Sequence, residues 1–522
     1  MRPVIFVLLI ILASGCKKEP TTWDTDISAP LLKSTLTLQD LFSDSLLVVD
    51  NDNLASIFFE DEIFNIGIDS VLKEAQADTI TEVFTIAPVQ QFTFNPGQQF
   101  YTSEDDFELR ALDAELKYIK LKAGVLKVTA TNTIASKLNF TITIPKATIN
   151  GEALELESVI PQATPTELGK LETEIDFSNY ELDLSGPDGN SFNVLEIDFA
   201  LSIPEDGNPT TVFNTDEVVL NTTYENLEVD FAEGYLGSEN FDFDEGSSFD
   251  ELADLQEAII DLESAQMNLS FTNGFGVDIR TQIFDFAAKN SHSATEAELN
   301  HSLVGTNINL TRAAISGGKI SETVREFDIS TDNSNIVDLI ELIPDSIKAS
   351  GFAELNPLGN IGNYNDFASS ESVLKCSATI DIPLHASISQ LSLRDTSAIN
   401  LGDDYELLGI KLYLLAENSF PADAELEVSI ADEQDHILVN LDDYLVNTES
   451  PTLFGRTALD PVQTLLVYQL DEVGVNAIQS GAKFITNIQF QTTNYPDRMV
   501  FTGDDKIELI LSADAGLTLD VE

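Results

Sequence analysis

Hydrophobic and polar residues alternate along much of this chain, in the pattern of half-buried β-strands. The clearest alternating stretches are LKVTATNT, LNFTITIP, LEIDFALSIP, AELEVSIA and IELILSA. Turn signals such as Asn150-Gly151 and Gly317-Gly318 separate them. Apolar residues recur at helical spacing in three short segments, 249–261, 335–343 and 471–480. The pattern therefore predicts a mainly β protein with a few short helices, the last of them capped by Asp471.

A motif repeats at three asparagines, Asn132, Asn273 and Asn418, which are spaced by 141 and 145 residues. Apolar residues occupy the positions six, four and two before each asparagine and the position two after it. The same parity then continues, except that the second copy places Thr281 and Asp285 where apolar residues are expected. Asparagine can adopt left-handed backbone or bond its own chain in a turn. Each copy therefore predicts a strand, a bend and a second strand within a unit of about 140 residues.

This strand–asparagine–strand pattern resembles that of LEA-2-type and tubular lipid-binding β domains, in which strands flank an N-x-apolar kink. The resemblance implies a multi-domain chain of repeated β-sandwich-like or tubular β units. We divide the chain as follows: 1–15 signal peptide, 16–35 tether, 36–232 first β domain with repeat unit 1, 233–370 repeat unit 2, and 371–522 repeat unit 3.

The N-terminus has the features of an export signal: Arg2, an apolar run from Val4 to Leu12, and small residues before Cys16. The run LASGC resembles the lipobox of bacterial lipoproteins. The stretches FAEGYLGSENFDF and IPDSIKASGFAELNP resemble large lipoproteins of Bacteroidetes-type bacteria. This resemblance implies that Cys16 becomes the N-terminus, carries acyl chains such as palmitate, and holds the protein on either face of the outer membrane. The alternative is an ordinary signal peptide with an incidental cysteine.

The charge balance limits the ligands. The chain carries 89 acidic and 26 basic residues, a formal net charge of −63. Nucleic acid is not an expected partner, because binding a phosphate backbone needs a basic surface. Direct attraction to anionic lipid is disfavoured for the same reason, so the predicted membrane contact is made by the acyl chains on Cys16. We interpret the acidic surplus as a solvated coat.

One segment is a candidate calcium site. Asn240, Asp242, Asp244 and Glu251 occupy positions 1, 3, 5 and 12 of an EF-hand-like loop, where oxygen ligands bind Ca²⁺. However, Glu245 occupies the position that requires glycine. The alternative is an acidic strand, because Phe241 and Phe243 alternate with the acids. The four residues are therefore weak candidates for a metal site.

The sequence contains no recognisable catalytic motif, neither a G-x-S-x-G elbow nor a P-loop, an H-E-x-x-H motif or a dinucleotide-binding fingerprint. Cys376 lies at strand spacing and is predicted to be a buried apolar residue without a disulfide partner. The four histidines are scattered and are interpreted as surface residues. No catalytic residues are assigned, and the chain is not expected to be an enzyme.

Four tripeptides resemble the Asp-Ser/Thr-apolar acceptors of O-glycans in such bacteria. Their acceptor residues are Ser45, Ser70, Thr79 and Ser346. A glycan needs an exposed acceptor, so these are candidates for modification.

Three functions remain open. The first is a lipid-anchored envelope protein with a structural or interaction role. The second is a periplasmic protein that binds or transports a lipid or another apolar ligand. The third is a hydrolase of a surface polymer. A cavity through the β units would favour the second, and filled cores with exposed faces would favour the first.

Overall fold

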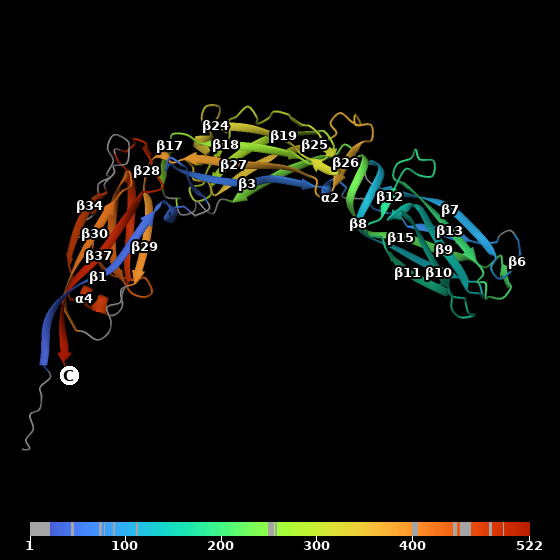
Figure 1. Cartoon of the computed structure of the whole chain (residues 1–522), viewed down its shortest axis with the longest axis horizontal. Helices are drawn as coiled ribbons and strands as arrows, with labels where there is room; N and C mark the ends of the chain where they lie inside the picture. The colour runs from blue at the N-terminus through green and yellow to red at the C-terminus, as the bar shows by residue number, and fades with distance from the viewer. Residues whose placement is uncertain are drawn as a thin grey trace, which may run out of the picture.

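The computed structural model describes residues 21–42, 46–72, 76–77, 79–86, 89–110, 113–248, 255, 258–398, 406–441, 446–448, 461–479, 483–493 and 495–521. The chain forms three β units in a row, and both outer units bend to the same side of the middle one (Figure 1). We name them unit 1, unit 2 and unit 3 after Asn132, Asn273 and Asn418. All pairings between the named strands are antiparallel, which matches the alternation in the sequence.

Unit 3, at the end where the chain terminates, has two facing sheets with the orders β1-β37-β30-β34 and β29-β35-β31-β32, and β33 also pairs with β31. Its strands are β1 (Thr21–Thr37), β29 (Leu391–Ala398), β30 (Glu406–Asn418), β31 (Ala422–Ala431), β32 (Ile437–Asn440), β33 (Val446–Thr448), β34 (Val462–Gln469), β35 (Lys483–Thr492) and β37 (Lys506–Val521).

Unit 2 has the same plan, with the sheet orders β2-β3-β27-β18-β24 and β16-β25-β19-β20, and β21 also pairs with β19. Its strands are β2 (Leu47–Val49), β3 (Ala55–Gly67), β16 (Asn240–Ser248), β18 (Gln266–Asn273), β19 (Ile279–Asn290), β20 (Thr295–Glu298), β21 (Ile308–Leu310), β24 (Thr323–Ser330), β25 (Ser346–Leu355) and β27 (Val373–Pro383).

Unit 1 repeats the plan again. β5, β15, β8 and β11 pair in one series and β7, β13, β9 and β10 in another, while β12 pairs with both β8 and β9 and joins the two. Its strands are β4 (Gln76–Ala77), β5 (Ile80–Phe84), β6 (Gln91–Phe94), β7 (Gln99–Arg110), β8 (Glu115–Asn132), β9 (Leu138–Ile149), β10 (Glu152–Ile160), β11 (Gly169–Asp176), β12 (Glu181–Asp183), β13 (Val194–Ser202), β14 (Thr210–Phe213) and β15 (Val218–Tyr235).

Short elements connect the units. The strands are β17 (Ile259–Leu262), β22 (Ala314–Ser316), β23 (Lys319–Ser321), β26 (Asp366–Ser369), β28 (His385–Ser389) and β36 (Met499–Val500), and the helices are η2 (Leu38–Asp40), α2 (Ile68–Val71), α3 (Ile336–Ile340) and α4 (Glu472–Gln479). The predicted helices at 335–343 and 471–480 are confirmed as α3 and α4, and the Asp471 carboxylate accepts the Gly474 N–H at 2.9 Å as a cap. In the predicted helix 249–261, residues 259–261 belong to β17 instead, and most of the remainder lies outside the described residues.

The units are nested in the chain. Strand β1 pairs with the C-terminal strand β37 in unit 3, and β3 pairs with β27 in unit 2. Unit 1 is therefore inserted between β3 and β16, and units 2 and 1 together between β1 and β29. The boundaries expected at 36, 233 and 371 describe a linear row and assign β1 largely to a tether and β3 to the first domain. The observed pairing differs from this linear row, because β1 and β3 are stable only where their partner strands, β37 and β27, complete the sheet.

Each repeat asparagine fixes the crossing from one sheet of its unit to the other. The three asparagines end β8, β18 and β30, and all three side chains are buried. In each, the amide nitrogen donates to the carbonyl four residues later at 2.9–3.0 Å. The amide oxygen accepts the N–H two residues later at 2.8–2.9 Å. The expected bond to the asparagine's own chain is confirmed. None of the three has a positive φ, since the side-chain bonds turn the chain without left-handed backbone.

The residues flanking the asparagines fill the cores, as predicted. The residues at −4 and +2 are buried in all three units: Val128, Ile134, Leu269, Phe275, Leu414 and Phe420. The departures in the second copy have a structural cause. Thr281 is buried and its hydroxyl donates to the Phe352 carbonyl at 2.7 Å. A bulge between Ile283 and Asp285 then turns Asp285 outward and places Phe286 in the core.

Candidate functional site

Several predicted site residues are in unsuitable positions or lie outside the described part of the chain. Cys16, Ser45 and Glu251 are outside it. Ser70 is half-buried in α2, and Ser346 is half-buried in β25, paired on both sides, with its hydroxyl on Asp345 at 3.1 Å. Thr79 is exposed, and its hydroxyl lies 3.1 Å from that of Thr223. Thr79 is therefore the accessible acceptor among the described candidates.

The EF-hand-like reading of the acidic segment is wrong. Residues 240–248 form strand β16, so Asn240, Asp242 and Asp244 project from one face in a row and do not surround a point. Phe243 points the other way and stacks on Phe64, with ring centroids 4.4 Å apart. Asp244 pairs with Lys348 at 2.8 Å. Within the described ranges, no group of three acidic, histidine or cysteine side chains is arranged to hold a metal ion.

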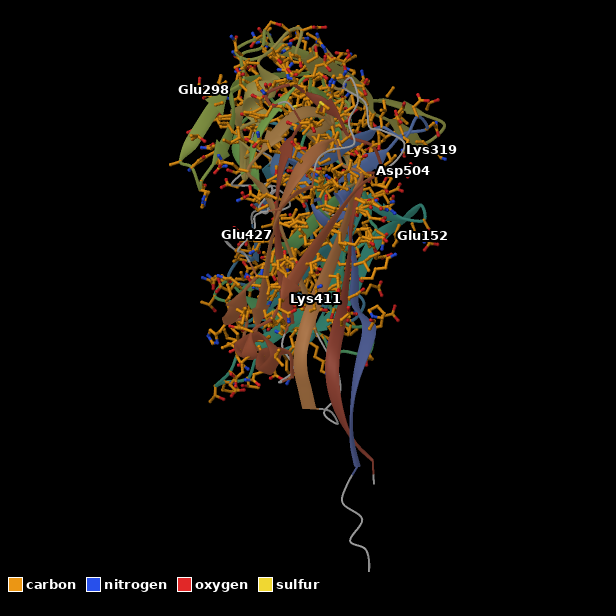
Figure 2. The ribbon with its side chains drawn as sticks, turned by 90° about the vertical axis from the view of Figure 1, so that its left-hand side faces the viewer. Glu152, Glu298, Lys319, Lys411, Glu427 and Asp504 are labelled. Carbon is orange, nitrogen blue, oxygen red and sulfur yellow. The ribbon has the colours of Figure 1, made fainter. Side chains whose placement is uncertain are left out.

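The acidic residues form a dispersed coat. In Figure 2, side-chain oxygens are distributed over the visible surface of the units, and Glu152 and Glu298 project from its outline. Cys376, as predicted, is fully buried in β27, and burial raises the pKa of its thiol, which suppresses the nucleophilic thiolate. His385 contacts Glu263. The cysteine therefore has no features of a catalytic nucleophile.

A groove of about 1040 Å³ lies between units 1 and 2. Strands β8 and β15 of unit 1 supply one wall, and the β22–β23 hairpin, the start of β24 and the turn after β26 supply the other. The lining residues are Tyr118, Lys120, Asp230, Phe231, Gly274, Ile315, Gly318, Lys319, Ile320, Glu322, Val324, Ser369, Ser370, Glu371 and Ser372. A volume of this order accommodates a small-molecule, short glycan or peptide ligand.

The unit 1 wall of the groove is held by a polar network. Lys120 pairs with Asp230 at 3.0 Å, and the Ser370 hydroxyl donates to the other oxygen of Asp230 at 2.9 Å. The hydrogen bond from Lys120 lowers the pKa of Asp230 despite its partial burial. Burial, together with Glu181, Glu233 and Asp230, raises the pKa of Tyr118 to about 12, so its hydroxyl stays neutral at physiological pH. The wall is therefore preorganised.

Ser372, in the second wall of the groove, is held within its turn by hydrogen bonds. The Ser372 hydroxyl donates to the Gly274 carbonyl at 2.8 Å and accepts the Ser369 N–H at 3.0 Å. These two bonds hold the hydroxyl within the turn and direct its hydrogen to the Gly274 carbonyl. Neither histidine nor cysteine is among the described residues that line the groove. Sequence reasoning identified Gly317-Gly318 as a turn but missed this groove, because its walls come from different units.

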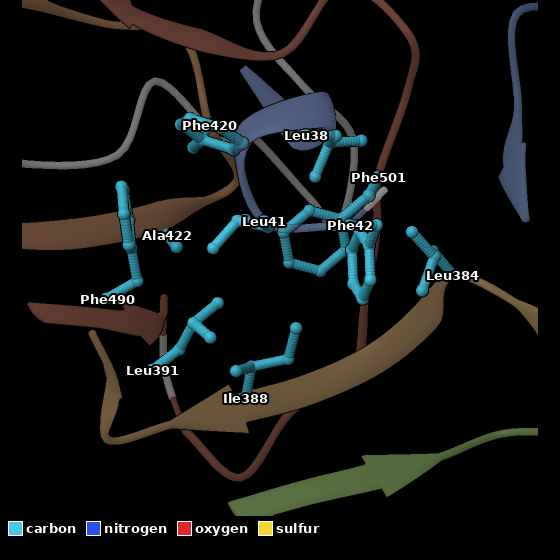
Figure 3. Close-up of a pocket in the computed structure, with 10 residues that line it drawn as sticks. All are labelled: Leu38, Leu41, Phe42, Leu384, Ile388, Leu391, Phe420, Ala422, Phe490 and Phe501. Atoms are coloured by element: carbon cyan, nitrogen blue, oxygen red, sulfur yellow. The ribbon is translucent and has the colours of Figure 1, made fainter. Parts of the chain in front are cut away.

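The interior of the junction between units 2 and 3 has no room for a ligand. Ten apolar residues enclose a space of about 20 Å³, close to the volume needed for one water molecule (Figure 3). Phe42, Phe420 and Phe501 are among the side chains that fill it. Within the described part of the chain, no helix has the length and hydrophobicity needed to cross a bilayer.

The comparisons identify no family. No protein-family model and no curated protein matches the chain. A solved structure of a protein described as secreted, from Parabacteroides distasonis, aligns over 94% of this chain and 99% of its own at 9% identity, with a TM-score of 0.27. The infectious bursal disease virus VP2 subviral particle aligns over 92% of this chain and 86% of its own at 9% identity, with a TM-score of 0.12. With TM-scores this low, neither likeness bears on function.

Proposed function

We propose that this chain is a lipid-anchored protein of the bacterial outer membrane whose three β units form a stiff arch with a structural or interaction role. The observation that carries the proposal is the nesting of the units. Because β1 pairs with β37, both ends of the chain emerge from unit 3 (Figure 1). An anchor at Cys16 would then hold unit 3 next to the membrane, with unit 1 at the other end of the arch.

The packing supports a rigid scaffold. Each unit has a filled core, and each junction is continuous: β15 of unit 1 pairs with β26, while β28 pairs with both β17 and β36. The filled junction between units 2 and 3 gives no support to the alternative of a carrier with an internal apolar cavity. The groove between units 1 and 2 is the surface we assign to partner or ligand binding. The hydrolase alternative has no supporting arrangement of groups among the described lining residues.

The anchor can be tested in cells. Replacing Cys16 with serine should move the protein from the membrane pellet to the soluble envelope fraction and remove the mass of the acyl chains. Surface exposure is decided by protease treatment of intact cells. A Cys16→Ser protein that still pellets with membranes and has an unchanged mass would overturn the lipid anchor.

The groove can be tested with a photo-crosslinking residue at Val324, in the groove, and at Ile437, in unit 3. Both side chains are 57% exposed, which makes Ile437 a matched control. The proposal expects a defined adduct in living cells from position 324 and not from position 437. Equal labelling at both positions would argue against a specific groove partner.

A further inference from the structure

Unit 1 has an uncovered end that the other two units do not have. In unit 3, Phe420 and Ala422 of the asparagine crossing pack with Leu384 and Phe501 at the junction with unit 2. In unit 2, Gly276 of the crossing donates its N–H to the Phe367 carbonyl, in the segment whose strand β26 pairs with unit 1. In both units the crossing end is thus covered by the next unit.

The crossing of unit 1 lies at the far end of the arch. Its Thr133 N–H donates to the Glu217 carbonyl, and its Ile134 carbonyl accepts the Ala163 N–H. In units 2 and 3, a whole further unit is inserted between the first long strand and the next long strand. In unit 1 the corresponding segment, between β5 and β7, is only residues 85–98. That segment contains β6, which pairs with β14 in a two-stranded ribbon at the end of the molecule opposite the termini (Figure 1).

The ribbon and the residues just before it expose apolar side chains, and its strand β6 lies in an unusually uncharged segment. Val89 is 51%, Phe92 49% and Phe213 47% exposed. Phe92 is paired with Val212 and Phe213 with Gln91, so the two rings lie on opposite faces of the ribbon at neighbouring positions. No charged residue occurs from Val83 to Ser103, in a chain of which 22% is charged. Terminal repeats normally present a polar outer face, so this end has the character of a contact surface.

We propose that this ribbon is a second membrane contact, which inserts Val89, Phe92 and Phe213 into the headgroup region of the bilayer that holds the Cys16 anchor. The arch supports this partner, because units 1 and 3 bend to the same side of unit 2 and bring the ribbon back toward the side of the termini (Figure 1). The inference rests on the proposed lipid anchor. Once the chain is anchored, even a weak contact is populated, because it becomes intramolecular.

The charges near the ribbon specify the lipid. The charged residues around this end include Lys137, Lys170, Glu167, Glu205, Asp206, Asp216 and Glu217. Their excess of acids opposes an anionic surface, whereas apolar side chains partition into any bilayer interface. The expected target is therefore a zwitterionic bilayer, and the binding should not depend on basic residues.

The test uses the soluble form with Cys16 replaced by serine and the signal peptide removed, so it does not depend on acylation. In a Trp23→Phe background, which removes the only tryptophan, Phe213→Trp reports the ribbon. Phosphatidylcholine vesicles should shift its emission to the blue. Ile361→Trp, at an exposed position of unit 2, is the control and should not shift. No shift at position 213 overturns the inference.

A second measurement removes the apolar side chains. Phe92→Gln with Phe213→Gln should lower vesicle partition about tenfold, from the lost burial of two half-exposed rings. Leu358→Gln with Ile361→Gln, which removes two exposed apolar residues elsewhere, should not. Adding phosphatidylglycerol should weaken binding at low salt. If the ribbon variant changes self-association or binding to a protein and leaves vesicle partition intact, the membrane contact is wrong. If the shift occurs but Cys16 is not acylated in cells, only the anchor proposal fails.

Discussion

The two junctions of the arch each bury a carboxylate, but they hold it differently. Between units 1 and 2, Asp366 is fully buried, and Arg312 lies 3.3 Å from one of its oxygens. Asn356 donates to the other oxygen at 2.8 Å. Between units 2 and 3, Asp505 is 1% exposed and is bound by the N–H and hydroxyl of Thr502 at 2.7 and 2.9 Å. No cation among the described residues lies within ion-pair distance of Asp505.

The surroundings explain the difference. The junction between units 2 and 3 is an extension of the apolar core, and Asp505 serves only to close the turn before β37. The junction between units 1 and 2 lies beside an open groove, and Arg312 also pairs with Asp278 at 3.1 Å, which links the crossing of unit 2 to the linker. One junction therefore depends on apolar area and the other on a charged network. The two should respond differently to truncation and to charge removal.

Phe420→Ala should have the largest effect, because it breaks the apolar junction. The ring is 2% exposed and packs edge-on against Phe490 with centroids 5.0 Å apart. Its loss should lower the free energy of unfolding of unit 3 by about 3–5 kcal/mol through lost burial and a cavity. Urea titration followed by Trp23 fluorescence measures this. Phe284→Ala, at an exposed ring of unit 2, is the control, and an equal loss there would contradict the explanation.

Arg312→Met should break the polar junction next most strongly. It leaves Asp366 buried without its cation, which should cost about 2–4 kcal/mol. Calorimetry measures the loss, and small-angle scattering should show greater bending between units 1 and 2. The defect should shrink as the pH falls, because burial raises the pKa of Asp366 and the carboxylate becomes neutral when it takes up a proton. Arg394→Met, at an exposed pair with Asp435 3.7 Å apart, should cost under about 1 kcal/mol. Similar losses in both variants would show that the network does not hold the junction.

Asp505 should make the apolar junction sensitive to pH. Burial raises its pKa to about 6. Between its ordinary pKa and about 6, the folded state binds more protons than the unfolded state, so stability falls as pH rises through this range, by about 3 kcal/mol. Asp505→Asn should flatten this part of the urea-derived pH profile relative to the native chain. Asp188→Asn, in an exposed loop, should not; an unchanged slope in Asp505→Asn would refute the assignment.

Asn273→Ala should have the smallest effect of the four. It tests the crossing of unit 2, which adjoins the polar junction. It removes bonds to the carbonyls of Val277 and Thr311 and to the Phe275 N–H. The unsatisfied buried groups should cost about 1–3 kcal/mol. Asn132→Ala, in the same arrangement, should cost a similar amount when measured by thermal unfolding. Asn190→Ala, at an exposed turn, should be within about 0.5 kcal/mol of the native chain. A large difference between Asn132 and Asn273 would mean that the junction, and not the crossing, sets the cost.

The sequence by itself determined the local structure. Alternation defined β8, β9, β13, β31 and β37, because a strand with one buried face requires a period of two. The asparagine motif located the three crossings, because its hydrogen bonds reach only two and four residues along the chain. The burial of Cys376 followed from the same parity. These features depend on neighbours in the chain, so a single sequence contains them.

Only the tertiary structure decided which distant strands pair. Nothing local in β1 or β3 specifies a partner beyond residue 370, and the nesting of the units therefore could not be predicted from periodicity. The groove and the buried Asp366–Arg312 pair also depend on residues from separate segments. The acidic segment shows that local spacing can also suggest a structure that does not form. Its spacing fits an EF-hand loop, but pairing of β16 with β25 extends it into a strand. The free energy of sheet pairing comes from contacts between residues far apart in the chain, whereas the sequence pattern reflects only interactions between near neighbours.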